Sequence, residues 1–411
     1  MTRTDDTLLD EASRVLPELR SSFSRIISSL PSPVRRPRDL ILSLGVRQTL
    51  AWKIMQVVHS RDAFAAAQHL PGTEGMNIFL EAAARKNVPT DAIDRARAAI
   101  ADFQRLIVDH AGDRASLELM LGAATKDSVS PNELAYRKGS FQCASFVWGV
   151  QARARLMSII LCPDEDPQRL RLAKVAGYVG LRRVRPEIQW TLWHASCGAF
   201  QDSKVRRTLP FRPIDPEGVL PTGVPLLQEF CAAPPEQIQR FAVSEDEFED
   251  RWVGGPVGDK AAITCFTGEV IRSAAPRYRD PENLYHEFGL QVRTPVEVLV
   301  QDLFVHRDLY GKVDPSLTVY SELGGRPWYS LPQSLRRDNN TLSFPERIEH
   351  LGQGSSVIHS TDIPRYDEMM PAAFRRLGWD IERCDVFRVR MAYPVIATAV
   401  VTGFDIPPAP Q

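Results

Sequence analysis

Residues 37–59 read PRDLILSLGVRQTLAWKIMQVVH, and this stretch predicts two short helices joined by a tight turn. Pro37 suits the first position of a helix, because the N–H group that proline lacks would have no partner within the helix there. Leu40, Ile41 and Leu44 follow at helical spacing and predict one apolar face. The first helix is therefore expected to begin at Pro37 and to end at Leu44.

The turn is expected at Gly45, directly after this apolar face. Glycine readily adopts the left-handed backbone that a sharp turn between helices requires, and Val46 can pack into the angle between them. Helical spacing resumes from Thr49 to His59, with its apolar residues on one side. The segment predicts a helix, a glycine turn and a second helix.

Positive charge surrounds these two helices. From Pro31 to Ser60 the chain has five basic residues and a single acidic residue, Asp39, which gives a local net charge of +4. The whole chain has a formal net charge of -1, so the excess is confined to this segment. A local basic patch on a small helical module is typical of nucleic-acid binding.

The segment resembles the helix-turn-helix family of DNA-binding proteins. Gly45 falls where that family places its turn glycine, and Ile41 takes the small or apolar position of the first helix. Ala51 and Ile54 fall on the buried positions of the second helix. The resemblance implies that helix 48–59 lies in the major groove of double-stranded DNA.

One departure from the family is the start of the second helix. Many members have a capping Ser, Thr or Asp there, whereas this chain has Arg47 and Gln48. Arg and Gln are the residue types that read guanine and adenine edges in the major groove. The resemblance implies a set of DNA-binding side chains that face outward from the second helix or lie beside phosphates near the first: Arg35, Arg36, Arg38, Arg47, Gln48, Thr49, Lys53 and Gln56.

Composition is that of an ordinary globular protein. The chain has 411 residues, of which 44% are hydrophobic and 25% charged, which allows two or three domains. The six cysteines are scattered without a C-x-x-C pair, so we expect reduced thiols. No apolar run approaches the ~20 residues that span a bilayer, and the N-terminus lacks a signal-like apolar region. These features predict a soluble cytoplasmic protein with no membrane partner.

Helical spacing predominates in the first third of the chain. Residues 1–125 are expected to form an all-α region with the helix-turn-helix segment as a DNA-binding domain, and the predicted helices cover residues 7–30, 37–44, 49–59, 62–69, 74–86, 91–110 and 115–121. Residues 126–411 are expected to form a larger sensing or oligomerisation domain, with a proline-rich crossover at 204–236 as a dividing segment. The predicted fold class is α+β: an all-α N-terminal region, then a mixed, mainly antiparallel sheet with helices.

Alternation of apolar and polar residues, with β-branched and aromatic content, predicts strands in the second domain. The expected strands cover residues 141–150, 152–161, 187–193, 317–320, 357–359 and 386–404, the last of them interrupted at Pro394. Residues 296–306 are strongly apolar. Tyr366–Leu377 is predicted to be a helix. The arginines of the segment 171–186 are expected on a surface connector, and the acidic segment 244–250 on a solvated loop or helix start.

Catalytic motifs are not found in the second domain. His286, His306, His350 and His359 lack the compact spacing of a metal site, and GGPVGDK at 254–260 lacks the spacing of a phosphate-binding loop. We therefore predict no catalytic residues, no metal and no cofactor. Five tryptophans are candidates for the wall of a ligand pocket: Trp148, Trp190, Trp193, Trp328 and Trp379.

The leading hypothesis is a sequence-specific DNA-binding transcriptional regulator. Its expected partners are double-stranded DNA, a second copy of the chain in a homodimer or higher homo-oligomer, and a small-molecule effector. One alternative is a structural or assembly protein that forms homo-oligomers, because an ordinary α-hairpin also has a glycine between its helices. Another is an enzyme whose site lies in the C-terminal half, around the four histidines.

Overall fold

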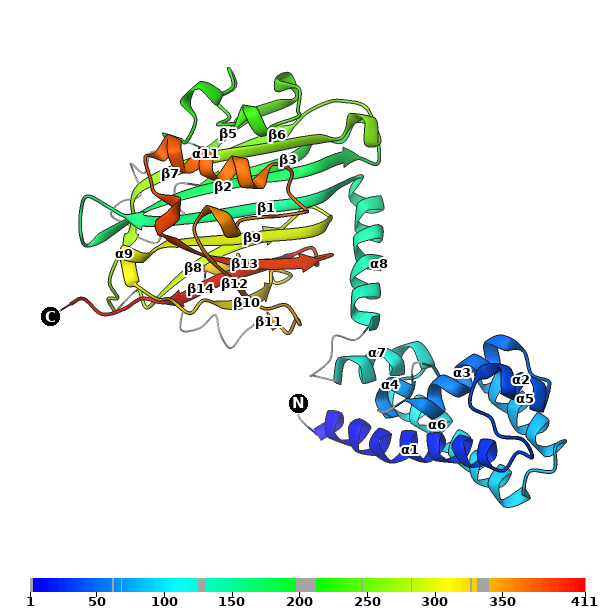
Figure 1. Cartoon of the computed structure of the whole chain (residues 1–411). Coiled ribbons are helices and arrows are strands. Elements are labelled where there is room, and N and C mark those ends of the chain that lie inside the picture. Colours follow the sequence, from blue (N-terminus) through cyan, green and yellow to red (C-terminus); the bar gives the residue numbers. More distant parts are fainter. Residues whose placement is uncertain are drawn as a thin grey trace. The chain divides into compact units, whose positions relative to one another are not determined.

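The structure is a computed structural model, and it describes residues 3–60, 63–67, 69–124, 131–196, 212–244, 247–281, 283–325, 327–330 and 340–410. The chain divides into two compact units, Met1–Glu133 and Leu134–Gln411. The first unit is helical and the second is built mainly from antiparallel strands with few helices (Figure 1). The predicted α+β fold class is confirmed.

The first unit is built from seven helices in the part that the structure describes. They are α1 (Arg3–Ser28), α2 (Pro37–Leu44), α3 (Gln48–His59), α4 (Ala63–Ala67), α5 (Thr73–Ala84), α6 (Thr90–His110) and α7 (Arg114–Ala124). Each lies where helical spacing predicted a helix, with ends displaced by a few residues. The buried apolar side chains of all seven helices form one core, in which α1 packs along α6.

The second unit begins with a long helix and continues into strands. The helices are α8 (Pro131–Trp148), α9 (Arg307–Tyr310) and α11 (Tyr366–Leu377). The strands are β1 (Val150–Pro163), β2 (Arg169–Arg183), β3 (Trp190–Ser196), β4 (Arg212–Pro213), β5 (Ile238–Ser244), β6 (Glu247–Trp252), β7 (Ile263–Pro276), β8 (Tyr285–Val292), β9 (Val296–His306), β10 (Ser316–Ser321), β11 (Thr341–Leu342), β12 (Glu349–Gln353), β13 (Cys384–Ala392) and β14 (Thr398–Asp405).

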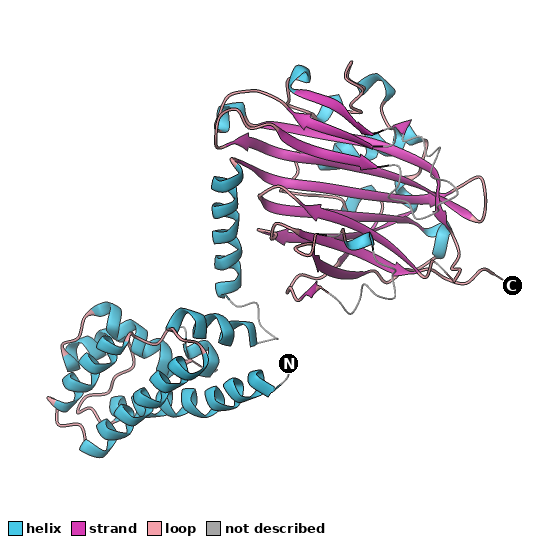
Figure 2. Ribbon diagram, turned by 180° about the vertical axis from the view of Figure 1, so that it is seen from behind, coloured by secondary structure: helices cyan, strands magenta, loops and turns pink. Residues whose placement is uncertain are grey.

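These strands form three sheets. The largest has the order β12-β13-β9-β1-β2-β7-β4, and within it only β1 and β9 are parallel among the described pairs. A second sheet has the order β11-β10-β14-β8 and a third the order β3-β6-β5. The strands form broad layers, seen from behind in Figure 2, and α11 lies against the seven-stranded sheet (Figure 1).

The two faces of the seven-stranded sheet have different partners. Along β1, Leu156 and Ile160 pack with Met369 and Phe374 of α11. The alternate residues of the same strand, such as Ile159, belong to a second core that includes side chains of β8, β10 and β14. Because successive side chains of a strand point to opposite faces, one strand contributes to both cores. The strand pattern of residues 152–161 therefore reflects burial on both sides.

Four sequence predictions in this unit are wrong. Residues 141–148 are the end of helix α8, residues 171–183 belong to β2, residues 247–250 belong to β6, and residues 355–357 form a 3-10 turn in place of the strand expected at 357–359. The expected interruption at Pro394 is confirmed, since β13 and β14 flank it and belong to different sheets. Residues 204–211 of the proline-rich crossover and 245–246 of the acidic segment lie outside the described residues.

Helix α8 shows why the strand prediction for residues 141–148 fails. Arg137 in its first half is only 6% exposed. It pairs with Glu346 at 2.7 Å and donates to the backbone carbonyl of Tyr393 at 3.2 Å. These contacts join residues more than 200 positions apart, and such tertiary context overrides the strand propensity of Phe, Val and Trp.

Candidate nucleic-acid interface

The turn between α2 and α3 has the backbone that its glycine permits. Gly45 has φ of 68° and ψ of 22°, in the left-handed region, and its N–H donates to the carbonyl of Ile41 at 2.8 Å. Only Gly45, Val46 and Arg47 separate the last residue of α2 from the first of α3. A residue with a branched Cβ resists this conformation, so the glycine determines the tight turn.

The apolar residues of this segment hold the two helices together. Leu40 and Leu44 of α2, Val46 of the turn, and Ala51 and Ile54 of α3 are all buried in the core of the first unit. Ile41 is half-buried and packs against the same core. Because the buried residues come from both helices and the turn, the outward face of α3 has a fixed orientation.

That outward face carries the predicted DNA-binding residues of the second helix. Gln48, Thr49, Lys53 and Gln56 of α3 are exposed, as is Arg47, the residue that precedes the helix. The spacing of these positions places them on one face of the helix. No acidic residue occurs in α3.

Trp52 belongs to the same face and was not among the predicted site residues. Its side chain is 45% exposed, and its ring meets the ring of His69 edge-on with centroids 5.6 Å apart. Trp52 lies four residues after Gln48 and four before Gln56, so helical spacing alone could have assigned it to this face. A large aromatic side chain here adds contact area beside the polar residues.

The arginines at and just before the start of α2 are also exposed, and the single acid among them has a structural role. Asp39 Oδ2 accepts hydrogen bonds from the backbone N–H groups of Arg35 at 3.0 Å and Arg36 at 2.9 Å. These two bonds, with a smaller contribution from the charges of Arg36 and Arg38, lower the pKa of Asp39. Asp39 thereby caps the start of α2, and the guanidinium groups of Arg35, Arg36 and Arg38 stay exposed on the surface.

The four candidate histidines of the second unit, His286, His306, His350 and His359, are not brought together as a metal site. His286 is buried, bonds to the hydroxyl of Tyr310 at 2.9 Å, and has its pKa lowered to about 4 by burial. His306 accepts from the backbone N–H of Asp308, and His350 stacks on Phe387. Among the residues that the structure describes, no three His, Cys, Asp or Glu side chains are grouped to hold a metal ion.

A buried polar network in the second unit was not visible in the sequence. Asp302 of β9 is fully buried, and its carboxylate accepts two hydrogen bonds from Arg388 of β13, at 2.8 and 2.6 Å. It also accepts one from the hydroxyl of Tyr366 of α11 at 2.6 Å, and that hydroxyl lies 2.8 Å from Ser158 Oγ of β1. The network joins α11 to three strands of the largest sheet.

Arg183 is a further buried group of the second unit. The sequence prediction that it lies on the surface is wrong. Its side chain is 1% exposed, with its guanidinium carbon 3.4 Å from the centroid of the Trp252 ring. Its Nε donates to the carbonyl of Ile188 at 2.7 Å, and burial lowers its pKa to about 10. Stacking of the planar guanidinium on an aromatic ring lets β2 bury an arginine.

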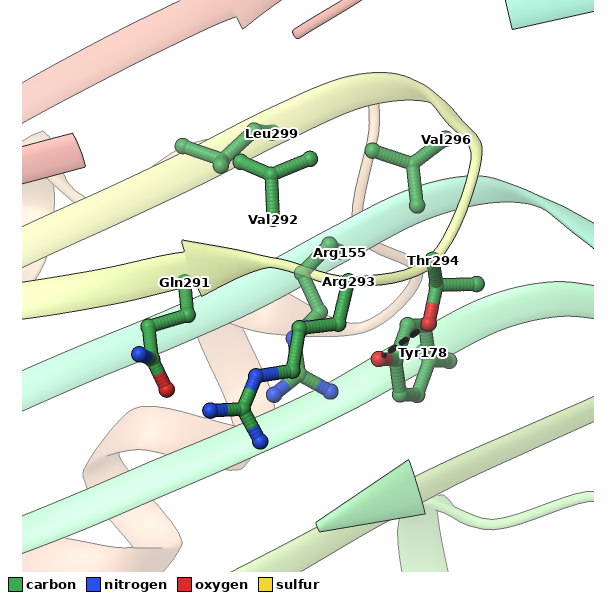
Figure 3. Close-up of a pocket in the computed structure, with 8 residues that line it drawn as sticks. All are labelled: Arg155, Tyr178, Gln291, Val292, Arg293, Thr294, Val296 and Leu299. Carbon is green, nitrogen blue, oxygen red and sulfur yellow. Dashed lines mark hydrogen bonds between the residues drawn. The ribbon is translucent and has the colours of Figure 1, made fainter. Parts of the chain in front are cut away.

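A small pocket lies at the end of β8, and its lining residues are drawn in Figure 3. None of the five predicted tryptophans lines it, although the indole N–H of Trp190 donates to the lining residue Thr294 at 2.9 Å. Trp193 packs against Tyr178, another lining residue, with ring centroids 6.3 Å apart. These two tryptophans therefore contact lining residues of the pocket without lining it themselves.

Comparison with known proteins finds no matching family model, no matching curated protein and no matching solved structure. Among the described helices, none combines the length and apolarity needed to cross a bilayer. The five cysteines within the described residues form no disulfide, and Cys197 lies outside them.

Proposed function

We propose that this protein is a sequence-specific DNA-binding transcriptional regulator that places α3 in the major groove of duplex DNA. The observation that carries the proposal is the exposed polar and basic face of α3, presented by a helix, glycine turn and helix whose apolar residues are buried. In DNA-binding proteins of this arrangement, the first residues of the second helix contact base edges. Gln48, Thr49 and Lys53 occupy that place in this chain.

Each exposed residue has a role that its chemistry suits. Gln48 and Gln56 can donate to and accept from adenine, and Arg47 can bind guanine with two hydrogen bonds. Arg35, Arg36 and Arg38 neutralise backbone phosphates beside the groove, which sets the register of the protein on the duplex. The absence of acidic residues from α3 removes a source of repulsion from the phosphates.

The decisive experiment is selection of bound sequences from a random duplex library by the full-length protein at moderate salt. An enriched motif is expected. Gln48→Ala and Lys53→Ala are expected to weaken its selection, by roughly 5- to 150-fold where a residue reads a base. If Lys53 binds a phosphate instead, Lys53→Ala lowers the slope of log K against log salt by about 0.9.

Arg85→Ala and Lys86→Ala provide matched controls. Both residues are exposed and basic and lie just after α5 in the same unit, away from the α3 face in sequence. They are expected to leave the enriched motif unchanged. Absence of any enriched motif from well-folded protein, or equal losses in all four variants, would contradict the proposal.

A second candidate function, homo-oligomeric assembly through the second unit, is favoured by the surface of α8. Phe146, Val147 and Trp148 at its end are 72%, 60% and 51% exposed. Exposed apolar side chains in series are typical of protein contact sites. A double-stranded operator read by two copies would use both functions, because dimers of helix-turn-helix proteins bind paired half-sites. The mass of the protein in solution distinguishes a monomer from a homodimer or a larger assembly.

A further inference from the structure

The pocket at the end of β8 is lined by two arginines from separate elements. Arg155 comes from β1, and Arg293 follows β8 in the turn toward β9. In Figure 3 the two guanidinium groups point in the same direction, as does the amide of Gln291. Two like charges that line one small pocket repel each other, and an anion bound between them would offset this repulsion.

Arg155 has polar atoms that the protein itself does not satisfy. Its guanidinium carbon lies 4.0 Å from the centroid of the Tyr178 ring, so the face of the group is stacked. Its Nε and Nη1 atoms are shielded from solvent and have no hydrogen-bond partner. Buried charged donors without partners are costly, and because Nε and Nη1 lie on different edges of the guanidinium, each can donate a separate hydrogen bond to an acceptor.

The turn that carries Arg293 is held in place by its neighbours. Thr294 Oγ1 lies 2.8 Å from the hydroxyl of Tyr178 and accepts from Trp190. The carbonyl of Pro295 accepts from the backbone N–H of Ala152 at 2.9 Å. Arg293 itself is exposed, so its guanidinium can turn toward a ligand on this fixed support.

The acidic residue Glu322 contacts the lining of the pocket through Gln291. Glu322 Oε1 accepts from Gln291 Nε2 at 2.6 Å and from the backbone N–H of Trp328 at 3.3 Å. These bonds orient the Gln291 side chain at the rim of the pocket. The enclosed part of the pocket has a volume of about 10 Å³, which is room for about one water molecule, so a ligand group would bind at the open mouth with the rest of its molecule outside.

We propose that this pocket binds the oxyanion group of a small molecule, either a carboxylate or a phosphate, between Arg155 and Arg293. The stacked guanidinium of Arg155 donates to the oxyanion from the inner side, and Arg293 closes on it from the turn. The site lies within the second unit and is independent of DNA binding by the first.

The test is thermal unfolding of the full-length protein in inorganic phosphate and in acetate, each compared with sodium chloride at equal ionic strength. A rise in Tm of about 2 °C or more, saturable with concentration, is expected with at least one of the two oxyanions. Phosphate also stabilises proteins by exclusion from their surface, so the variants decide the outcome. A response to phosphate alone assigns a phosphate ester, and a response to acetate assigns a carboxylate.

Arg155→Met and Arg293→Met are expected to abolish the rise, and Arg375→Met to preserve it. Met retains the apolar stem of arginine, and Arg375 is an exposed arginine of α11 that does not line the pocket. Arg293 is exposed, so its variant tests the site without disturbing the core. The proposal is overturned if neither oxyanion raises Tm above the chloride control, or if all three variants respond as the wild type does.

A purely structural role for Arg155 gives a different result. In that case Arg155→Met lowers Tm without ligand, because the stacking on Tyr178 is lost, and Arg293→Met leaves the oxyanion response intact. If Arg155 serves the ligand, the ligand-free Tm of Arg155→Met is unchanged or higher, since the variant removes an unsatisfied buried charge.

Discussion

The two units bury different kinds of side chain. Within the described residues of the first unit, Ser22 is the one buried polar side chain, and the core of the unit is apolar. The second unit buries ionisable groups that include Arg183, Asp250, His286 and Asp302. A core of apolar helices depends on spacing along each helix, whereas a buried charge depends on a partner from another element.

The largest expected effect comes from breaking the Asp302 network of the second unit. Asp302→Ala leaves the Arg388 guanidinium without its carboxylate, and we expect a loss of about 3–5 kcal/mol in the free energy of unfolding. Denaturant unfolding followed by tryptophan fluorescence measures the change.

A matched ion pair of the first unit sharpens this contrast. Asp94 pairs with Arg97 on the surface of α6, with side chains 59% and 67% exposed. Asp94→Ala is expected to change the stability by less than about 1 kcal/mol. Comparable losses from Asp302→Ala and Asp94→Ala would refute the distinction between the buried ion pair of the second unit and the exposed pair of the first.

Next in size is the pH dependence of the second unit through His286. Burial lowers its pKa to about 4, so the folded state holds this imidazole neutral while the unfolded chain, with a pKa near 6.5, binds a proton. The free energy of unfolding is therefore unaffected by His286 above about pH 6.5. It falls by roughly 3 kcal/mol in total as the pH falls from 6.5 to 4, because the unfolded chain binds a proton that the folded state does not.

His286→Gln isolates this contribution, because Gln does not titrate and can still bond to Tyr310 Oη. Unfolding measured at several pH values should show a flatter profile between pH 4 and 6.5 in the variant than in the wild type. Identical profiles would mean that His286 does not cause the loss of stability between pH 6.5 and 4. The first unit has no buried histidine among its described residues that would add a similar slope.

The turn of the first unit predicts a smaller and local effect. A Cβ at Gly45 would meet nothing within 4 Å, so the cost of a substitution comes from its φ of 68° alone. Gly45→Val is expected to destabilise this unit by about 1–3 kcal/mol, and Gly45→Asn by less, because Asn tolerates the left-handed region. Helical circular dichroism during unfolding measures both.

The same pair of variants also tests DNA binding. Gly45→Val is expected to lose duplex binding because it misplaces α3, and Gly45→Asn to retain it. If Gly45→Val binds duplex as tightly as the wild type, the turn does not set the orientation of α3.

The smallest expected effect concerns Asp39. Two backbone N–H groups lower its pKa, so its stabilising contribution is present above pH 3.8 and is lost as the pH falls through the lowered value. Asp39→Asn should reduce the stability of the first unit slightly at neutral pH and leave the wild type and the variant equally stable at strongly acidic pH. Unfolding at pH 7 and pH 2 checks this difference, and an equal difference at both values would contradict the capping role.

Sequence patterns predicted the first unit better than the second. The helix ends near Pro37 and Leu44 and the glycine turn follow from residues within a few positions of one another, and the structure has them there. In the second unit, residues 141–148 have strand-forming side chains, yet they form a helix that Arg137 anchors to Glu346. Contacts across such distances leave no periodic signal in the sequence.

The α3 face and the pocket of the second unit also differ in how far the sequence predicts them. The exposed face of α3 follows from helical spacing, which also accounts for Trp52 although it was not named in advance. The pocket of Arg155 and Arg293 has no sequence signal, because its residues come from β1, β2, β8, β9 and the turn between β8 and β9. The register of β1 with β2, which pairs Arg155 with Tyr178, brings them together.

The sequence by itself determined the α+β class, the helices of the first unit and the turn at Gly45, since each depends on periodicity or on the conformational freedom of one residue. Only the tertiary structure decided which charged side chains are buried. Asp302 and Arg183 resemble surface residues in the sequence, and their burial is tolerated because a charged partner or an aromatic ring from a distant strand stabilises their charge.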